Sequence, residues 1–459
     1  MNNEQHEDKK ASRRDFIKLA AASLGGTILT GAGAGCGGSA IIGGSGGFGG
    51  NIGIGVIPNG YTFFRVFTPG PGSLLPEVDK LLGGVLNNDT NILFYAQATS
   101  RKIGLYQFEI SYPGGIPQTT QPSILLNQGD SLGGRLTIGT IGSAALSNRG
   151  AYSVCAAVVT ADSDGSGDAR FRGVQSLWHN RAGTFDLLVA NQDKTPDGSF
   201  FGAHMGDVAI NSKGDVIFAS DYTHETDIGH FKAQGLWQLY GVRSSTNGKL
   251  LSTTGDIVDG ANGAISQFGI CDFDDQGNFI AQFSSAGDSR ARARGEVSTG
   301  IIGGKPGSAP FLLHGGSGRA AGTVSAFFGP RIRGGNYTAL LHTDPSHTQQ
   351  TLTYNGHPVT STGAASPLGR TINGLGPGSV TNDLTHFLAT VDNGMELVVS
   401  NGATNKTILK YGDILANSPV EIRGIVHGYH SNQSDGSGRI VFIGEFADGS
   451  QSIIVGIPH

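Results

Sequence analysis

Short apolar runs separated by polar turns recur along this chain, and their alternation of apolar and polar residues is typical of β-strands. The clearest copy is residues 208–219, which read VAINSKGDVIFA. Within it, Asn211 can bond the backbone two residues on, and Gly214 accepts a positive φ angle. The pattern therefore predicts two strands joined by a tight reversal.

The same phrase recurs at nearly regular intervals. Alignment on Gly214 gives seven anchor positions, 49 to 64 residues apart: Thr90, Gly150, Gly214, Gly277, Gly335, Leu384 and Gly438. A second landmark, a Gly-Asp pair or its remnant, precedes the anchor in six units, at Asp130, Asp193, Asp256, Gly315-Gly316, His357 and Asp413. A repeat of this length indicates a modular β architecture.

Each unit contains enough apolar runs for about four strands, which in the third unit we expect at 208–211, 215–221, 235–240 and 249–253. Because the segment after residue 58 shows no helical periodicity, the sequence predicts an all-β fold, a β-propeller of seven blades with about four strands each.

The last unit supplies only three apolar runs, at 425–429, 439–446 and 451–457, and the run at 61–67 precedes the first unit. We expect this N-terminal strand to complete the last blade, which leaves no long strand edge unpaired. Four apolar residues share one phase of their strands and are predicted to fill the space between blades: Phe218, Phe442, Val154 and Leu388. The recurring turn residues Asn211, Asp274 and Asp435 are interpreted as structural.

Asn211, Gly214 and Phe218 have counterparts in other units, together with the Gly-Asp landmark. Through these residues the segment 80–445 resembles bacterial exported proteins with tandem Asn-x-x-Gly-x-x-Ala-Phe repeats, which often carry variable anchoring or sorting signals. The fifth and sixth units lack the Asn and most of the Phe. The resemblance implies export and a propeller-like architecture, and it implies no reaction.

The N-terminus carries an export signal. Residues 12–18, SRRDFIK, resemble the twin-arginine consensus, with Arg13, Arg14 and Phe16 at its specified positions. A Lys-bearing polar stretch precedes them, and an apolar segment rich in Ala and Gly follows to residue 35. We interpret residues 1–35 as a signal peptide, whose apolar run is too short for a permanent membrane span.

Two cleavage patterns end this signal. Residues 32–34, Ala-Gly-Ala, suit ordinary signal peptidase, whereas Ala34-Gly35-Cys36 resembles the end of a lipobox in which Gly33 replaces the usual aliphatic residue. We favour lipidation of Cys36, because the Gly-rich residues 36–58 form a suitable flexible tether before a propeller domain at 59–459. The protein would then meet the membrane only through its anchor, in the periplasm, at the cell surface or outside the cell.

The composition argues against nucleic acid as a binding partner. The 459 residues include 75 Gly, only 15% charged residues and a net charge of −5, with no basic patch suited to nucleic acid. We expect a monomer that binds a carbohydrate, peptide or protein. Of the three cysteines, Cys155 and Cys271 fall within the repeats, where we expect buried free thiols.

Candidate chemistry is sparse. Asp162, Asp164 and Asp168 alternate with Ser and Gly as in short Ca²⁺ loops, although Gly173 replaces the bidentate Glu of an EF-hand. Ca²⁺ at this loop or in the central channel is the candidate cofactor, and a solvated strand connection is the simpler interpretation.

Histidines supply the other candidate metal ligands. His224, Glu225, Asp227 and His230 gather in an expected long connection after Asp221, without a known zinc spacing. The remaining candidates could converge at one mouth of the ring but share no repeat phase: His204, His314, His342, His386, His427 and His430. We therefore favour a non-enzymatic binding or scaffolding role, and the alternative is a hydrolase or lyase that uses a metal in the central channel.

Overall fold

The computed structural model describes residues 48, 55–131, 136–147, 152–161, 174–181, 184–226, 229–242, 244–259, 261, 263–286, 297–315, 326–342, 348–381, 383–426, 433–434 and 437–459. Over these residues the chain consists of β-strands and one short 3₁₀-helix, η1 (Pro113–Gly115). No helix within the described ranges is long and apolar enough to cross a membrane.

The described strands form seven antiparallel sheets, numbered here in chain order. Sheet 1 contains β2 (Val78–Asn87), β3 (Asn91–Ala98), β4 (Ile103–Ser111), β5 (Gln118–Thr119) and β6 (Ser123–Asn127). Sheet 2 contains β7 (Leu136–Leu146), β8 (Tyr152–Ala161), β9 (Val174–Arg181) and β10 (Thr184–Val189). Sheet 3 contains β11 (Phe200–Ile210), β12 (Val216–Thr226), β13 (Gly229–Leu239) and β14 (Gly248–Thr253). Sheet 4 contains β15 (Ala264–Phe273), β16 (Phe279–Ala286), β17 (Val297–Gly304) and β18 (Phe311–Gly315).

The remaining sheets follow the same plan. Sheet 5 contains β19 (Ala326–Arg333), β20 (Asn336–His342), β21 (Gln350–Tyr354) and β22 (His357–Ser361). Sheet 6 contains β23 (Ile372–Leu375), β24 (Ser379–Val380), β25 (Thr385–Val391), β26 (Gly394–Ser400) and β27 (Asn405–Lys410). Sheet 7 contains β28 (Ile422–Ile425), β29 (Gln433–Ser434), β30 (Ile440–Phe446), β31 (Gln451–Pro458) and β1 (Tyr61–Phe67).

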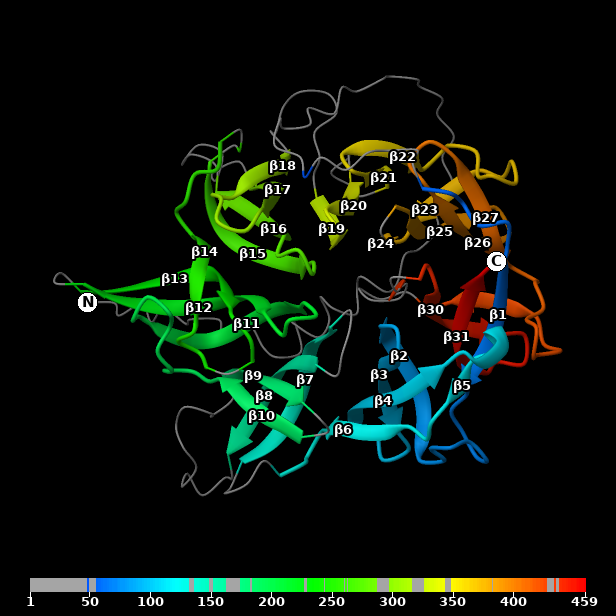
Figure 1. Ribbon diagram of the computed structural model, residues 1–459, viewed down its shortest axis with the longest axis horizontal. Helices are drawn as coiled ribbons and strands as arrows, with labels where there is room; N and C mark the ends of the chain where they lie inside the picture. Colours follow the sequence, from blue (N-terminus) through cyan, green and yellow to red (C-terminus); the bar gives the residue numbers. More distant parts are fainter. Residues whose placement is uncertain are drawn as a thin grey trace, which may run out of the picture. The chain divides into compact units, whose positions relative to one another are not determined.

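The sheets are arranged around a central axis as in a β-propeller (Figure 1). One inner strand of each sheet contacts an inner strand of the next, in the order β2, β7, β11, β15, β19, β24, β29 and back to β2. The all-β fold and its propeller arrangement are thus confirmed, and the contact between β29 and β2 closes the ring.

Sheet 7 joins the two ends of the chain. β1 pairs with β31, with Thr62 opposite Ile457 and Phe64 opposite Val455, so the expected pairing of the N-terminal strand with the last unit is confirmed. Phe63, 5% exposed, packs edge-on against Phe442 of the same sheet. Because β1 is the outermost strand of this sheet, it covers the edge that β31 would otherwise expose.

The anchor positions mark equivalent turns. Each described anchor lies in or beside the connection between the strand nearest the axis and the next strand of its sheet, and Gly150 lies outside the described residues. Asn211 Oδ1 accepts hydrogen bonds from the backbone N–H groups of Lys213 and Asp215, 3.0 and 2.9 Å away. Gly214 adopts a φ of 81°. The structural interpretation of the turn is confirmed at Asn211, and Asp435 is outside the described residues.

The second landmark marks the crossover from one sheet to the next. At Asp130, Asp193, Asp256 and Asp413 the carboxylate accepts a hydrogen bond from the backbone N–H three residues earlier. The assignment of His357 to this landmark is wrong, because His357 begins β22. The equivalent turn lies at Gly363 and Ala364, where the N–H of Ala364 bonds the carbonyl of Ser361. Gly316 is outside the described residues.

The third unit has four strands as expected, but they are longer than predicted. The expected long connection after Asp221 is wrong, since β12 continues to Thr226 and pairs with β13 from Gly229 onward. His224 stands opposite Phe231 in this hairpin, and Glu225 stands opposite His230. Alternating polar and apolar residues here extend a projecting two-stranded ribbon, which a count of apolar residues alone does not detect.

The core lies between neighbouring sheets. Phe218 is fully buried in a cluster that includes Leu177 and Leu188 of sheet 2, and Phe442 shares a cluster with Leu388 of sheet 6. These contacts confirm the predicted packing of Phe218, Phe442 and Leu388. The side chain of Val154 is not among those described.

Antiparallel strands give the ring two faces. The anchor turns lie on one, which we call the anchor face, and the crossover turns lie on the other, which we call the crossover face, because one strand separates each anchor turn from the preceding crossover turn. The Nδ2 atom of Asn401 donates to the Gly55 carbonyl on the anchor face, and Lys406 Nζ donates to the carbonyls of Pro58 and Asn59. The chain therefore enters the propeller along its anchor face.

Besides Gly55 and Pro58, a third residue of the expected flexible tether contacts the propeller. Phe48 lies against Phe311 and Tyr337, with ring centroids 5.3 and 6.0 Å apart, beside the buried cluster between sheets 4 and 5. Gly303 leaves room for its ring, because a Cβ there would stand 2.7 Å from the Phe48 Cζ. Phe48 thus contacts the propeller far from the point where Gly55 meets Asn401, although its neighbours are Gly-rich.

Candidate functional site

Two places in the described structure gather polar side chains around a hollow: the end of the central channel near the anchor face, and a cleft on the crossover face. Bulges in the inner strands position the side chains of the channel, and connections between strands position those of the cleft. We describe the channel first.

A repeated β-bulge shapes the channel. In five inner strands the pairing register shifts at a glycine four residues before the last paired residue: Gly83, Gly142, Gly206, Gly269 and Gly329. A bulge inserts an extra residue and redirects its side chain. The residue after this glycine is Ser143 in sheet 2 and Asp207 in sheet 3. The Ser143 hydroxyl donates a hydrogen bond to the Asp207 carboxylate and links the two sheets.

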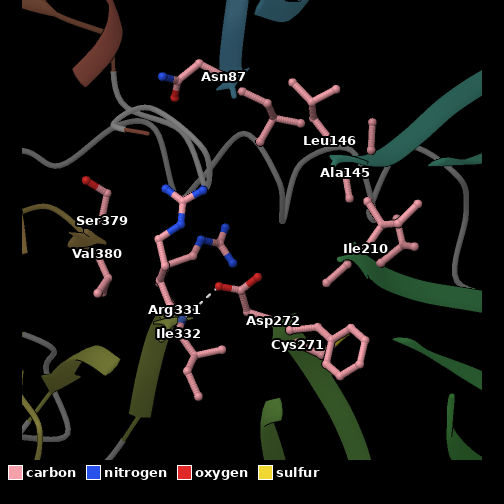
Figure 2. Close-up of a pocket in the computed structure, with 16 residues that line it drawn as sticks. Asn87, Ala145, Leu146, Ile210, Cys271, Asp272, Arg331, Ile332, Ser379 and Val380 are labelled. Carbon is pink, nitrogen blue, oxygen red and sulfur yellow. Dashed lines mark hydrogen bonds between the residues drawn. The ribbon is translucent and has the colours of Figure 1, made fainter. Parts of the chain in front are cut away.

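Charged groups from three sheets meet at the channel. Burial raises the pKa of Asp207 and of Asp272, while the Arg331 guanidinium acts in the opposite direction on both carboxyls. Arg331 is only 7% exposed. Asp272 Oδ2 also accepts a hydrogen bond of 2.9 Å from the backbone N–H of Ile332 on the next sheet. Figure 2 shows Asp272 beside the guanidinium groups of the neighbouring strand.

The hollow at this end of the channel is small, about 60 Å³, and six inner strands line it. Asn87 and Ser379 lie further around its wall (Figure 2). Asn87 Oδ1 is buried and has no hydrogen-bond partner within the described part of the chain. A hollow of this volume holds a few water molecules and is well below the size of a ligand pocket. We therefore interpret the charged channel residues as structural groups that join sheets 3, 4 and 5.

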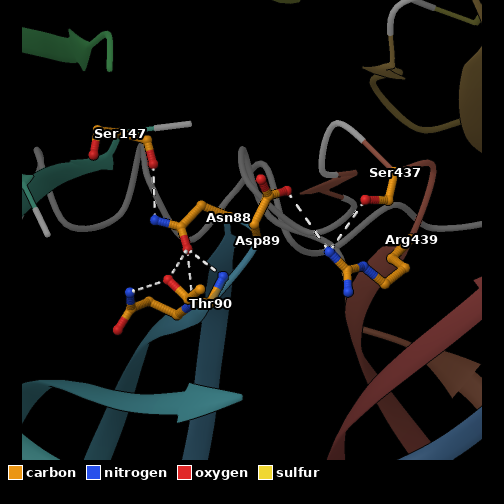
Figure 3. A network of polar contacts seen from close by, with 7 residues as sticks. Asn88, Asp89, Thr90, Ser147, Ser437 and Arg439 are labelled. Carbon is orange, nitrogen blue, oxygen red and sulfur yellow. Dashed lines mark hydrogen bonds and ion pairs between the residues drawn. The ribbon is translucent and has the colours of Figure 1, made fainter. Parts of the chain in front are cut away.

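A second polar network joins the sheets where the ring closes. The Asn88 side-chain amide donates to the Ser147 carbonyl of sheet 2, 2.9 Å away, while its Oδ1 accepts from the Thr90 and Asn91 backbone (Figure 3). The next residue, Asp89, pairs with Arg439 of sheet 7 at 3.7 Å. These contacts connect sheets 7, 1 and 2 at the anchor face.

The cleft on the crossover face is larger and open. It consists of two adjoining hollows of about 520 and 390 Å³, and Asn393 and Tyr411 line both. Thr390 and Arg423 contribute to the larger hollow, and Arg370 to the smaller. Its walls come from the β25–β26 hairpin, the crossover turns on either side of sheet 6 and the start of β28. All of these connections lie on the crossover face.

Tyr411 is held firmly in this cleft. The Arg423 guanidinium lies over its ring, 5.0 Å from the centroid, and donates a hydrogen bond to its hydroxyl. A Cβ at position 394 would stand 2.6 Å from the Tyr411 Cβ, so only glycine fits there. The ring therefore forms a fixed apolar plate between the two hollows.

Most of the residues singled out from the sequence lie elsewhere. Arg13, Arg14, Phe16 and Cys36 are outside the described residues, as are Asp162, Asp164, Asp168, His427 and His430. Among those described, His314 is buried in the outer strand β18, and His386 bonds the Tyr61 hydroxyl with 2.9 Å between Nε2 and oxygen. The described histidines do not converge, and within the described ranges no three His, Cys, Asp or Glu side chains form a group suited to a metal ion.

Cys271 is buried with a free thiol, as predicted, and Cys155 is not described at the side-chain level. Burial raises the pKa of the Cys271 thiol well above its usual value. Its Sγ donates a weak hydrogen bond, 3.4 Å long, to the Asp207 carbonyl. The thiol therefore packs within the inner strands.

Sequence reasoning missed the groups around both hollows. Asp207, Asp272 and Arg331 stand inside apolar runs just before the anchor turns, and a charged residue in such a run was the available signal. Tyr411 directly precedes the Gly412-Asp413 landmark, but nothing in its neighbours indicates that Asn393, eighteen residues earlier, lies beside it. That proximity is produced by the pairing of β26 with β27, in which Glu396 stands opposite Lys410 and the Tyr411 N–H bonds the Met395 carbonyl.

Comparison with known proteins yields similarity of fold only. No family model matches the chain, and no curated protein matches it in sequence. Among solved structures it is similar to a Dyadobacter fermentans protein of unknown function, with 11% identity over 87% of this chain and 98% of that chain and a TM-score of 0.38.

Two further similar structures are enzymes. A puromycin-hydrolysing peptidase of Mycobacterium tuberculosis is 11% identical over 85% of this chain and 53% of its own, with a TM-score of 0.42. An α-L-arabinofuranosidase of Fusarium graminearum is 11% identical over 86% of this chain and 96% of its own, with a TM-score of 0.36. This chain thus matches about half the length of the peptidase, and similarities this weak say nothing of what it binds.

Proposed function

We propose that the chain is an exported, lipid-anchored propeller, with each of its seven sheets as one blade, that binds a ligand without transforming it. The ligand site is the cleft around Tyr411. One observation carries this proposal: the cleft opens on the crossover face, whereas the chain enters along the anchor face, where Asn401 holds Gly55. The tether would then join the propeller on the face opposite the cleft.

The composition of the cleft supports binding. A ligand site combines a fixed apolar surface with a few polar groups that set orientation, and 300–1,000 Å³ is its usual size. The two hollows, at about 520 and 390 Å³, fall in this range, whereas the hollow in the channel does not. The residues that line the cleft include one carboxylate, Asp392, whereas glycoside hydrolysis ordinarily uses a pair.

Export is tested at the signal. Replacing Arg13 and Arg14 with Lys should keep the protein in the cytoplasm, because paired guanidinium groups define the twin-arginine signal and lysine does not replace them. Cys36→Ala should be exported but released from the membrane fraction, since anchoring depends on the lipid. Normal export of the double Lys variant, or a wild-type protein that is already soluble after export, would contradict this part of the proposal.

Binding is tested by hydrogen exchange on the mature exported protein, with and without defined oligosaccharides and a set of short peptides. A ligand in the cleft should slow exchange at 369–371, 390–395 and 411–413, and it should be recovered chemically unchanged. Protection confined to other segments, or turnover of the bound probe, would refute a binding function at this cleft.

A further inference from the structure

The cleft around Tyr411 also indicates a class of ligand. Resting on the function proposed above, we infer that it binds a neutral oligosaccharide of at least two sugar units, one in each hollow, with Tyr411 between them.

The first reason is the shape of the site. Asn393 and Tyr411 line both hollows, so a ligand that fills them must pass over a fixed aromatic ring. Sugar rings present C–H groups on their faces and hydroxyls at their rims, which suits an aromatic plate bordered by polar side chains. Thr390 and Arg423 border one hollow, and Thr371 and Arg370 border the other.

The second reason is charge. Both arginines in the cleft already have an acidic partner. Arg423 pairs with Glu421 at 3.1 Å, and Arg370 lies 3.9 Å from Glu396. The Asp392 carboxylate accepts a 2.8 Å hydrogen bond from the neutral amide of Asn373 and keeps its negative charge. These groups still offer hydrogen bonds to hydroxyls, but the cleft has no excess positive charge to attract an acidic polymer.

The third reason separates sugars from peptides. An extended peptide usually joins a sheet by pairing with the backbone of an edge strand. The cleft is built instead from the β25–β26 hairpin and from crossover turns, which present side chains at the ends of strands. A peptide would therefore find no row of backbone donors and acceptors in this cleft.

The test is a calorimetric titration of the mature exported protein with cellohexaose, maltohexaose, chitohexaose, oligogalacturonate and a mixed peptide set. At least one neutral oligosaccharide should bind. Tyr411→Ala should weaken that binding by about 10-fold or more, equivalent to about 1.4 kcal/mol. Tyr411→Phe, which retains the ring but loses the hydroxyl that Arg423 bonds, should weaken binding less than Tyr411→Ala does. Tyr240→Ala removes an exposed aromatic residue, 41% exposed, on another sheet and should have no effect.

The outcomes distinguish the two proposals. Binding of oligogalacturonate or a peptide that depends on Tyr411, without binding of a neutral sugar, would overturn the ligand class and leave the binding function intact. If every probe that binds is unaffected by Tyr411→Ala, or if none binds, the inference is wrong. Unfolding curves of the variants identify any loss of binding that is due to misfolding.

Discussion

Arg331 offers the sharpest test of the channel. Arg331→Met keeps an unbranched apolar stem but removes the cation that opposes the burial of Asp207 and Asp272. Removing one partner of a buried ionic group costs about 3–5 kcal/mol, because the opposite charge is left uncompensated. Against a typical unfolding free energy of about 5–15 kcal/mol, this loss is large.

The dependence on pH gives the effect a sign. The pKa values of both carboxyls are raised in the folded protein and should rise further in the variant. A folded state that holds protons more tightly than the unfolded chain gains stability as pH falls. The free-energy difference between wild type and Arg331→Met should therefore shrink from pH 7.5 to pH 5.

Urea unfolding followed by intrinsic fluorescence measures both quantities. Arg423→Met is the matched control, since the Arg423 side chain is 46% exposed and its loss should change the free energy of unfolding little. Equal losses in the two variants, or a difference from wild type that is constant with pH, would refute the interpretation of the channel as a buried ionic link.

Three further predictions concern stability. Phe63→Ala should lower the free energy of unfolding by about 3–5 kcal/mol in urea, because Phe63 packs between sheets 6 and 7. Phe64→Ala, on the other face of β1, should cost clearly less, and equal costs would mean that β1 does not pack as described. Burial lowers the pKa of His386 to about 3, so the unfolded chain takes up a proton that the folded one refuses, and stability falls as pH drops from about 6.5 toward 3. His386→Gln should make the free energy of unfolding from urea curves less dependent on pH in that window, by about 1.4 kcal/mol per pH unit. An unchanged pH dependence would count against a buried neutral imidazole. Phe48→Ala should lower the thermal midpoint although its neighbours are Gly-rich, and no change would show that its contact with Phe311 contributes nothing.

The repeat made much of the fold predictable. A turn built on Asn211 and Gly214 depends on local chemistry, so its recurrence located the reversals in successive sheets. The strand at 61–67 was recognisable because the last unit lacked a strand, and pairing with β31 follows from the cost of an unpaired edge.

Features set by distant contacts were not predictable in the same way. Phe48 follows a run of glycine and serine, and the space beside Gly303 in a distant strand explains how its ring packs. His357 was misassigned because spacing from the anchor does not fix a turn when strand lengths vary. The cleft depends on residues from three connections that strand pairing in sheet 6 brings together, and on Arg423, which the packing of sheet 7 adds.

The closed ring is the claim on which the rest depends, because it fixes both faces of the molecule. Hydrogen exchange of the mature exported protein, followed by mass spectrometry of peptides covering 59–70 and 451–458, tests it most directly. If β1 and β31 share one ladder, the two peptides should exchange slowly and with similar protection. Rapid exchange of 59–70 while 451–458 remains protected would contradict the account, because the N-terminal strand would then close nothing.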